Sequence, residues 1–312
     1  MKTKIAFFEC KEEERVFFEN SLNGVELSFF SGTINDALHV SEDFDAVSIF
    51  VHSKIDSDVL SKLPKLRYIQ TRSTGYEHLL CREMYKKGFL LSNVSGYGGP
   101  GVGEFAFSLL LNATRHTNEA IERSKRKDFH YDDLKGTELF GKKLGILGLG
   151  TIGMRMARIG HGFGMEIMVF SRTHKPILDE LGMRFVTLDA LLKECDVLMI
   201  ALPLTPDTKN LINKKAFSLM KQDTIIVNVA RAEIIEDRVY RDCKSIFCLD
   251  VLADRQLVSK KNILYTPHMA YYTHEAQERI LNISLKNIEA FVSGEELPNC
   301  LYLECQRNYK EK

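Results

Sequence analysis

A short apolar run that leads into three spaced glycines constrains the fold of this chain more than any other feature. Leu144–Leu147 is followed by Gly148, Gly150 and Gly153 in the pattern GxGxxG, and the residues behind it can form a helix. Between a strand and a helix, the first glycine permits a tight turn, the second lets the backbone approach a diphosphate, and the third allows close packing. The helix N-terminus then binds the diphosphate through its unpaired N–H groups. The pattern predicts a dinucleotide site at Gly148, Gly150, Thr151, Ile152 and Gly153; a glycine-rich turn without a ligand is the alternative.

The end of the next predicted strand bears on which dinucleotide is bound. Met165–Phe170 is followed by Ser171, Arg172 and Thr173, at the place where a carboxylate normally accepts hydrogen bonds from the adenine ribose. Hydroxyl groups and the Arg172 guanidinium, with Lys175 nearby, would instead make charge-assisted hydrogen bonds to a 2′-phosphate. The sequence therefore favours NADP(H), with NAD(H) as the second option. A solvated basic loop is the alternative.

Composition excludes several classes of protein. The 312 residues suffice for two domains, and the 45% hydrophobic content can fill two cores. The formal net charge is zero, so no nucleic-acid or membrane partner is expected. Met1–Cys10 holds only four consecutive apolar residues, which is too few for a signal or membrane segment, and we expect a cytoplasmic location. The seven cysteines lack the spacing of a zinc site, so we expect reduced thiols and no metal.

The first third of the chain alternates short apolar strands with polar helical stretches, which predicts a parallel sheet with helices on both faces. The predicted strands are Lys4–Phe8, Glu26–Phe30, Ala46–Val51, Leu66–Thr71 and Phe89–Asn93. Residues 95–103 then contain five glycines and a proline, which is typical of a hinge. A buried helix is predicted from Glu104 to Arg115.

A second series of strands follows the glycine motif, at Val197–Leu202, Thr224–Asn228, Ser245–Leu249 and Ile263–Tyr265. A long helix from Thr273 to Ser293 then ends at Gly294. We therefore predict an α/β protein with two doubly wound parallel-sheet domains. The predicted boundaries are 1–97 plus 294–312 for a substrate domain and 98–293 for the dinucleotide-binding domain.

Three polar residues follow predicted strands of the second series, where ligands of parallel sheets bind. Arg231, Asp250 and His268 come after separate strands. An arginine can grip a carboxylate or polarise a carbonyl, and a histidine can pass a proton to oxygen while hydride arrives at carbon. This set predicts hydride transfer on a 2-keto or 2-hydroxy acid. The alternatives are an interdomain salt bridge for Arg231 and a turn histidine for His268.

Most of the chain resembles the D-isomer-specific 2-hydroxyacid dehydrogenases, and within them the D-lactate dehydrogenases. Besides the glycine motif, the matching segments are Leu66–Gly75, Thr71–His78, Val102–Ala106, Leu202–Thr208, Asn228–Arg231, Leu249–Val251, Thr266–Ala270 and Ala270–Thr273. The resemblance implies a flavodoxin-like substrate domain, a Rossmann dinucleotide-binding domain, a cleft that closes on the cofactor, and a homodimer. It implies that the backbone N–H groups of Ser73, Thr74 and Gly75 bind the substrate carboxylate. It also implies a substrate contact at Tyr97 and cofactor contacts at Leu202, Pro203, Thr208, Ala230 and Asp250.

The chain departs from the family pattern beside the predicted catalytic histidine. Family members carry a Glu that pairs with this histidine, and Arg255 occupies that place here. A cation near His268 would lower its pKa, unless the loop is reshaped so that Asp254 or Asp250 pairs with it. The segment between Arg231 and Asp250 is also shorter than is usual, which could shift this loop. Ala232 replaces a glycine, a mild change if its φ is negative.

The sequence thus predicts an enzyme that reduces a small 2-keto acid to the D-2-hydroxy acid. Arg231 orients the substrate, His268 is the acid/base, and Asp254 is a further candidate catalytic residue. Pyruvate and D-lactate lead as the substrate pair, followed by glyoxylate or hydroxypyruvate. A nucleotide-sensing binding protein or corepressor-like scaffold with weak turnover is the alternative, and Arg255 is the feature that favours it.

Overall fold

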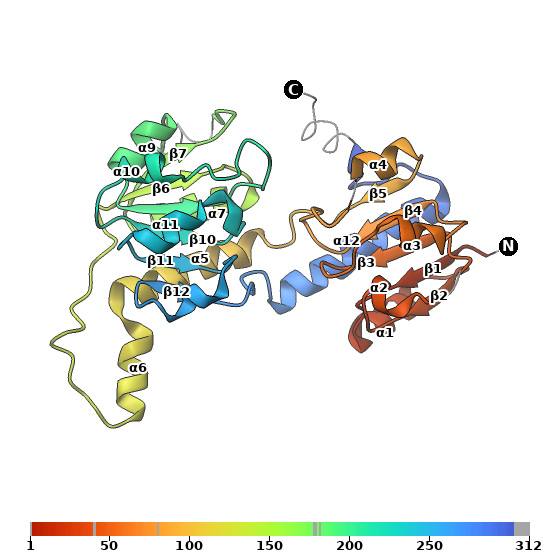
Figure 1. Cartoon of the computed structure of the whole chain (residues 1–312), viewed down its shortest axis with the longest axis horizontal. Helices are drawn as coiled ribbons and strands as arrows, with labels where there is room; N and C mark the ends of the chain where they lie inside the picture. Colours follow the sequence, from red (N-terminus) through yellow and green to blue (C-terminus); the bar gives the residue numbers. More distant parts are fainter. Residues whose placement is uncertain (1, 40–41, 80, 177–179, 181, 303–312) are drawn as a thin grey trace. The chain divides into compact units, whose positions relative to one another are not determined.

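The computed structural model describes residues 2–39, 42–79, 81–176, 180 and 182–302, and these form two compact units. The first unit contains the described residues up to Tyr97 and those from Thr273 onward, and the second unit is Gly98–Tyr272. Figure 1 draws both units as parallel sheets covered by helices. The predicted α/β class with two doubly wound sheets is confirmed.

The sheet of the first unit has five parallel strands in the order β2-β1-β3-β4-β5, which is the flavodoxin-like order. The strands are β1 (Lys4–Phe7), β2 (Glu26–Phe29), β3 (Ala46–Ile49), β4 (Tyr68–Thr71) and β5 (Leu90–Ser92). The helices are α1 (Glu12–Ser21), α2 (Ile34–Ala37), α3 (Ser57–Ser61), α4 (Cys81–Lys86) and α12 (His274–Ser293).

Alternate residues of β1 enter the two cores of this unit, as the period of a strand requires. Ile5 and Phe7 pack with Phe18 of α1 and Ile288 of α12. Ala6 and Phe8, the residue directly after β1, enter the core on the other face, together with residues of α2, α3 and α4. Helices therefore cover both faces, and the polar loops at the carboxyl ends of the strands are left at one edge.

The sequence-based domain boundary is wrong for the long helix α12, which was assigned to the dinucleotide-binding domain. Gln70 Nε2 of β4 donates to the Ser284 carbonyl at 3.0 Å, and Asn287 Nδ2 donates to the Asn93 carbonyl at 3.0 Å. Phe291 stacks on Tyr68 with ring centroids 4.7 Å apart. The helix thus belongs to the first unit, because its small and apolar face completes the core over β4.

The sheet of the second unit has seven parallel strands in the order β12-β11-β10-β9-β6-β7-β8, an extended Rossmann order. The strands are β6 (Lys143–Leu147), β7 (Glu166–Phe170), β8 (Arg184–Phe185), β9 (Val197–Ile200), β10 (Ile225–Asn228), β11 (Phe247–Leu249) and β12 (Ile263–Tyr265). The helices are α5 (Gly99–Arg115), α6 (Thr117–Lys125), α7 (Thr151–Gly162), α9 (Leu188–Glu194), α10 (Lys214–Ser218) and α11 (Asp237–Asp242), with 3₁₀ turns η1 (Ala232–Ile234) and η2 (Arg255–Ser259).

Part of the glycine-rich segment predicted as a hinge is helical. The unit boundary falls inside that segment, after Tyr97, but α5 begins at Gly99 and runs through the remaining glycines. A Cβ on Gly99 would lie 2.6 Å from Thr151 Cγ2, and one on Gly103 would lie 2.7 Å from Arg155 Cγ. These two glycines therefore let α5 pack closely on α7, which carries the glycine motif.

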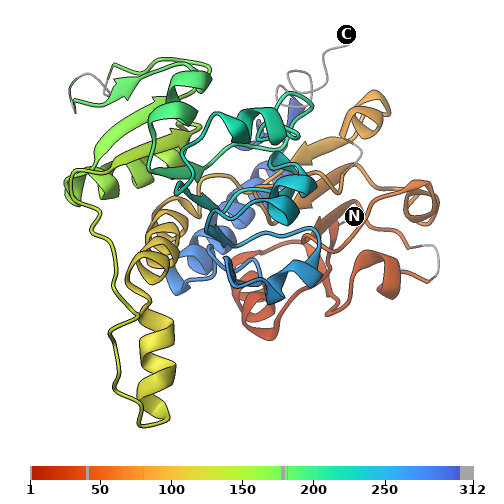
Figure 2. The same cartoon turned by 60° about the vertical axis from the view of Figure 1, so that its left-hand side comes forward.

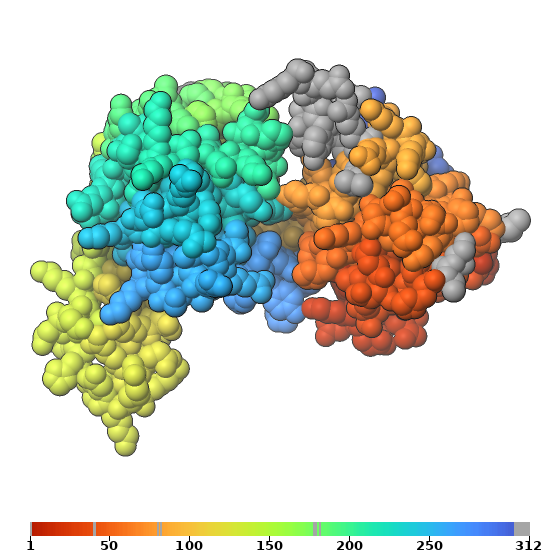
Figure 3. Space-filling model, in the orientation of Figure 1, coloured from red at the N-terminus to blue at the C-terminus, as the bar shows by residue number. Residues whose placement is uncertain are grey.

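Helix α6 and the loop that follows it project from the rest of the second unit as an arm (Figures 2 and 3). No residue of α6 is buried. Arg123 fastens the returning loop, because its guanidinium pairs with both carboxylate oxygens of Asp133 at 2.6 Å. This pairing lowers the pKa of Asp133 to about 2. Among the described residues, no helix has the length and apolar content that crossing a membrane requires.

Candidate active site

The glycine loop between β6 and α7 has the backbone shape that the motif predicts. Gly148 has φ +94°, and a Cβ there would lie 2.7 Å from the Ala201 carbonyl oxygen. A Cβ on Gly153 would overlap the Gly148 carbonyl. The protein's own packing therefore requires both of these glycines. Gly150 differs, because its φ is −77° and no atom lies within 4 Å of the added Cβ. Its open side suits a ligand that approaches the backbone.

This loop leads directly into an N-terminus that can bind an anion. Gly150 caps α7, whose first helical residue is the exposed Thr151, followed by the partly buried Ile152. The first N–H groups of any helix have no acceptor within it, and they carry the positive end of the helix dipole. The loop and this helix end therefore fit the diphosphate of a dinucleotide, as predicted from the sequence.

The loop after β7 presents cations and hydroxyl groups. Ser171 is partly buried, and Arg172 and Thr173 are exposed. Lys175 Nζ donates to the Leu149 carbonyl of the glycine loop at 2.8 Å, so this ammonium is held beside the glycine turn. Residues 171–175 contain no carboxylate. These side chains can donate charge-assisted hydrogen bonds to a negatively charged group.

The loop after β9 is closed by its own hydrogen bonds. Thr208 Oγ1 donates to the Pro203 carbonyl at 2.6 Å and accepts from the Thr205 N–H at 2.8 Å. Leu202 lies against the glycine loop, since its Cδ2 is 2.8 Å from where a Gly148 Cβ would be. Thr208 thus shapes the loop, and Ala201 and Leu202 are residues of this loop that lie against the glycine turn.

Arg231 extends from a turn that a buried asparagine organises. Asn228 is fully buried at the end of β10; its Oδ1 accepts from the Ala230 N–H at 3.0 Å, and its Nδ2 donates to the Arg231 carbonyl at 2.9 Å. Arg231 Nη1 donates to the Ala230 carbonyl at 2.8 Å. Ala232 begins η1 and is not among the described residues with positive φ, so its replacement of glycine is tolerated as predicted.

His268 lies in a loop that Asp250 holds in place. Oδ1 of Asp250 accepts from Thr266 Oγ1 at 2.6 Å and from the Met269 N–H at 2.9 Å, while Oδ2 accepts from the Ala270 N–H at 2.8 Å. His268, between these donors, has φ +54° and an exposed side chain. Such a backbone conformation is costly outside glycine and is found at functional sites.

These contacts change the role assigned to Asp250. It is fully buried, and both oxygens are bound to the His268 loop. The side chain has no exposed surface for the predicted cofactor contact, so we assign Asp250 to positioning the loop. Sequence reasoning missed this role, and it also missed that of Thr266; the only signal was that both residues directly follow strands.

Asp254, the other carboxylate predicted to serve His268, also has other partners. Its Oδ1 accepts from the Gln256 N–H at 3.0 Å, and its Oδ2 pairs with Arg241 Nη2 at 2.5 Å. Arg241 comes from α11, which has only six residues, in keeping with the shortened segment before Asp250. Arg255 begins η2 and is exposed. The structure thus places Asp254 in a surface ion pair that fastens η2 to α11.

Strand register brings the three post-strand residues of the second unit to one edge of its sheet. Asn228 is paired with Leu249, and Leu249 with Tyr265. Arg231, Asp250 and His268 follow these three residues by three, one and three positions. They therefore come from the carboxyl ends of adjacent strands, on the edge that also carries the glycine loop.

The loop Ser73–Gly75 of the first unit, predicted to bind the substrate carboxylate, follows β4. The Ser73 carbonyl accepts from the Val94 N–H at 3.0 Å, the Thr74 carbonyl from Asn93 Nδ2 at 2.8 Å, and the Gly75 carbonyl from Ser73 Oγ at 2.6 Å. No described residue accepts a hydrogen bond from the backbone N–H of Ser73, Thr74 or Gly75. The carbonyl groups of these three residues thus accept hydrogen bonds within the protein, while their three consecutive N–H groups can donate to a ligand. This arrangement fits the predicted carboxylate site.

Tyr97 is the last residue of the first unit before the chain enters the second unit, and its side chain is 8% exposed. Arg279 Nε of α12 donates to its carbonyl oxygen at 2.8 Å. This bond fixes the Tyr97 backbone against α12; the predicted substrate contact of the side chain stays a prediction.

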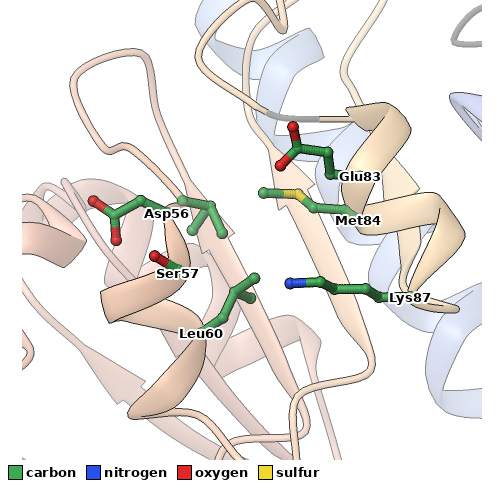
Figure 4. Close-up of a pocket in the computed structure, with 7 residues that line it drawn as sticks. Asp56, Ser57, Leu60, Glu83, Met84 and Lys87 are labelled. Atoms are coloured by element: carbon green, nitrogen blue, oxygen red, sulfur yellow. The ribbon is translucent and has the colours of Figure 1, made fainter.

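The first unit also contains a cavity of about 160 Å³, which is separate from the loop Ser73–Gly75. Figure 4 shows Glu83 and Met84 of α4, with Lys87 directly after this helix, facing Asp56, Ser57 and Leu60 across the cavity. None of the predicted site residues lines this cavity, so we assign it no part in the predicted chemistry.

Comparison with known proteins agrees with this geometry. Residues 107–270 match the family model for the NAD-binding domain of D-isomer specific 2-hydroxyacid dehydrogenases. The chain is 30% identical to the D-lactate dehydrogenase of Escherichia coli, over 95% of its own length and 99% of that enzyme. It is 34% identical to the glyoxylate reductase of Thermococcus litoralis, over 82% of its length and 83% of that enzyme.

A solved structure shares both units. The D-lactate dehydrogenase of Aquifex aeolicus, crystallised with NAD and lactic acid, superimposes with a TM-score of 0.86 at 29% identity, covering 95% of this chain and 98% of that one. Together with the family model and the two relatives, this match shows that the chain belongs to the D-isomer specific 2-hydroxyacid dehydrogenase family.

Proposed function

We propose that this oxidoreductase reduces pyruvate to D-lactate, with glyoxylate or hydroxypyruvate as the next substrates to consider. The observation that carries the proposal is the placement of Arg231 and the Asp250-bound His268 loop at the sheet edge that holds the glycine turn. An arginine, a histidine and a dinucleotide site together are what the reduction of a 2-keto acid requires. The names of the relatives in both substrate classes support the same range.

The roles follow from the chemistry of each group. The reduced nicotinamide, when bound, supplies a hydride to the carbonyl carbon of the substrate. Arg231 presents a fork of donors to the keto acid and stabilises the charge that develops on its carbonyl oxygen. His268, in its protonated form, donates a proton to that oxygen, so the product is a hydroxyl group and a neutral imidazole. The N–H groups of Ser73, Thr74 and Gly75 bind the substrate carboxylate.

We infer that NADP(H) is preferred over NAD(H). The exposed Arg172, the neighbouring Ser171 and Thr173, and Lys175 beside the glycine turn support this choice. Replacing Ser171 by Asp and Arg172 by Ala removes the phosphate partners and adds a ribose acceptor. We expect this double variant to favour NADH, with a loss of roughly 3 kcal/mol in NADPH binding. Steady-state constants for both cofactors test it, and a wild type that already prefers NADH tenfold would contradict the assignment.

We also propose a homodimer that forms through the α6 arm. Phe129, Tyr131 and Phe140 in the arm are more than 70% exposed, although aromatic side chains are usually covered. A second copy of the chain is the partner that would cover them. Sedimentation equilibrium tests this, and a monomer at micromolar concentration would overturn it. The predicted cytoplasmic location stays a prediction.

The substrate is tested by NADPH and NADH consumption with a panel of 2-keto acids, followed by chiral analysis of the product. D-lactate from pyruvate at the highest kcat/KM supports the proposal. An L-product, or turnover confined to substrates that are not 2-keto acids, would overturn it. The alternative of a binding protein or scaffold gains no support from the relatives named above, which are enzymes.

A further inference from the structure

A buried arginine joins three strand ends next to the loop Ser73–Gly75 of the first unit. Arg72 is 1% exposed, and its Nη2 donates to the Phe8 carbonyl at 2.8 Å and to the Glu9 carbonyl at 3.0 Å. Its Nη1 donates to the Ser48 carbonyl at 3.0 Å and to Ser48 Oγ at 3.2 Å. The guanidinium from the end of β4 therefore binds the ends of β1 and β3.

The side chain of Glu9 adds a second link between the loops that follow β1 and β3. Its carboxylate accepts from the N–H groups of Phe50, His52 and Ser53 at 3.0 to 3.1 Å and from Ser53 Oγ at 2.5 Å. The residue has φ +52°, a conformation that costs free energy in a side-chain-bearing residue. The Arg72 bond to its carbonyl and the four bonds to its carboxylate hold it there. Glu9 thus links the loop after β1 to the loop after β3.

Stability alone does not account for this arrangement. Arg72 Nε is buried and has no hydrogen-bond partner among the described residues. In the described part of the chain, the acidic side chain paired with Arg72 is Glu14, whose Oε2 lies 3.8 Å from Nη2. A buried ion pair of this kind contributes little to folding compared with apolar residues of the same volume, and an unsatisfied buried donor lowers stability further. A buried arginine such as Arg72 is expected where its hydrogen bonds fix the conformation of the backbone around it.

The loop that Arg72 fixes is the one with the three free donors. Arg72 directly precedes Ser73, and its own N–H donates to the Ile49 carbonyl at 2.8 Å. The far side of the loop is bound to the end of β5 through Asn93 and Val94. The loop is therefore held on both sides before any ligand arrives, and a positive charge lies one residue away from it. Donors that are already oriented need no reorganisation to bind an anion.

We propose that Arg72 and Glu9 are positioning residues that set the Ser73–Gly75 loop for the carboxylate of the substrate. The inference rests on the proposed function, because it takes the 2-keto acid carboxylate as the ligand of this loop. Neither residue touches the substrate. Both act through the backbone of the loop, so they control substrate affinity and leave the hydride step and the cofactor site unchanged.

Two conservative variants test the proposal in the full-length protein. Glu9→Gln keeps the volume but places an amide NH₂ where one carboxylate oxygen accepts hydrogen bonds from N–H groups. Arg72→Lys keeps the charge but offers a single nitrogen in place of the two that bind Phe8, Glu9 and Ser48. We expect KM for pyruvate to rise about tenfold in each, with kcat and the NADPH Kd within about twofold of wild type.

The matched controls carry the same changes at exposed sites of the same unit. Glu19→Gln alters a surface pair with Arg15, and Arg67→Lys alters a surface pair with Asp45. Both should keep the wild-type KM. The Ki of oxamate, a pyruvate isostere that cannot be reduced, should rise in parallel with KM in the two test variants only.

Each result decides the inference. A KM and an oxamate Ki equal to those of the controls would overturn it. A joint fall of kcat, cofactor binding and melting temperature would show a merely structural role and would also overturn it. If Arg72→Lys does not fold, Glu9→Gln decides alone. A wild type that reduces no 2-keto acid refutes the proposed function instead, so the two failures are distinguishable.

Discussion

Replacing Asp250 by Asn should remove hydrogen bonds that hold the His268 loop, while it preserves the volume of the side chain. The carboxylate accepts three hydrogen bonds at 2.6 to 2.9 Å, from Thr266 Oγ1 and from the N–H groups of Met269 and Ala270. An amide has one oxygen, so its NH₂ group must face at least one of these donors. The best arrangement keeps the oxygen at Oδ1 and leaves the buried Ala270 N–H without an acceptor.

The structure sets the size of the effect. A hydrogen bond to a charged group contributes about 1.5 to 3 kcal/mol, and a buried donor left unsatisfied costs about 1 to 3 kcal/mol. We therefore expect the free energy of unfolding of the second unit to fall by about 2 to 4 kcal/mol, which lowers Tm by roughly 5 to 15 °C for a unit of this size. Because His268 is held at φ +54° by the same bonds, kcat should fall by about tenfold to a hundredfold.

Asp254→Asn is the matched control, because it makes the same chemical change in the same segment. Its partner Arg241 is half-exposed, and such surface pairs contribute at most about 1 kcal/mol. Calorimetry and pyruvate reduction should show near wild-type values for this variant. If Asp254→Asn abolished turnover while Asp250→Asn remained active, Asp254 would be the partner of His268 and the assignment drawn here would be wrong.

Two further predictions concern the glycine loop and the thiols. Gly150→Ala should weaken NADPH binding at least tenfold with nearly unchanged Tm, because its Cβ meets no protein atom but stands on the ligand side; Gly148→Ala, at φ +94°, should instead lower Tm. A fluorescence titration that shows normal NADPH affinity in Gly150→Ala would contradict this. Burial raises the pKa of Cys195 and Cys248 to about 12, so at pH 8 they stay protonated and iodoacetamide should label the exposed Cys300 first. Since the raised pKa values disfavour the thiolates only in the folded state, stability should be complete below pH 9 and fall between pH 9 and 12. Peptide mass spectrometry decides the labelling, and equal rates at all three thiols would refute the burial argument.

Features set by local chemistry could be predicted from the sequence. The glycine turn, the strands around it and the placement of Arg231 and His268 after strands follow from periodicity and from the geometry of parallel sheets. Strand β8 could not be predicted, since Arg184 and Phe185 are both exposed and form only two residues of edge strand.

Features that depend on contacts between distant residues could not be predicted either. The apolar face of α12 could cover either sheet, and the contacts that place it on the first one, such as those with Gln70 and Asn93, are made by residues distant in the sequence. From the sequence, Asp250 was one of two carboxylates that could pair with His268. Its role depends on a loop conformation with positive φ at a histidine, which neither spacing nor propensity indicates.

The most direct test of the central claim is the pre-steady-state rate of NADPH oxidation by pyruvate in wild type and in His268→Gln. Glutamine can still hydrogen-bond the carbonyl oxygen but cannot donate a full proton to it. Loss of general acid catalysis should lower the rate by about 10² to 10⁴, with the Kd of NADPH unchanged. A His268→Gln variant that reduces pyruvate at the wild-type rate would contradict the account.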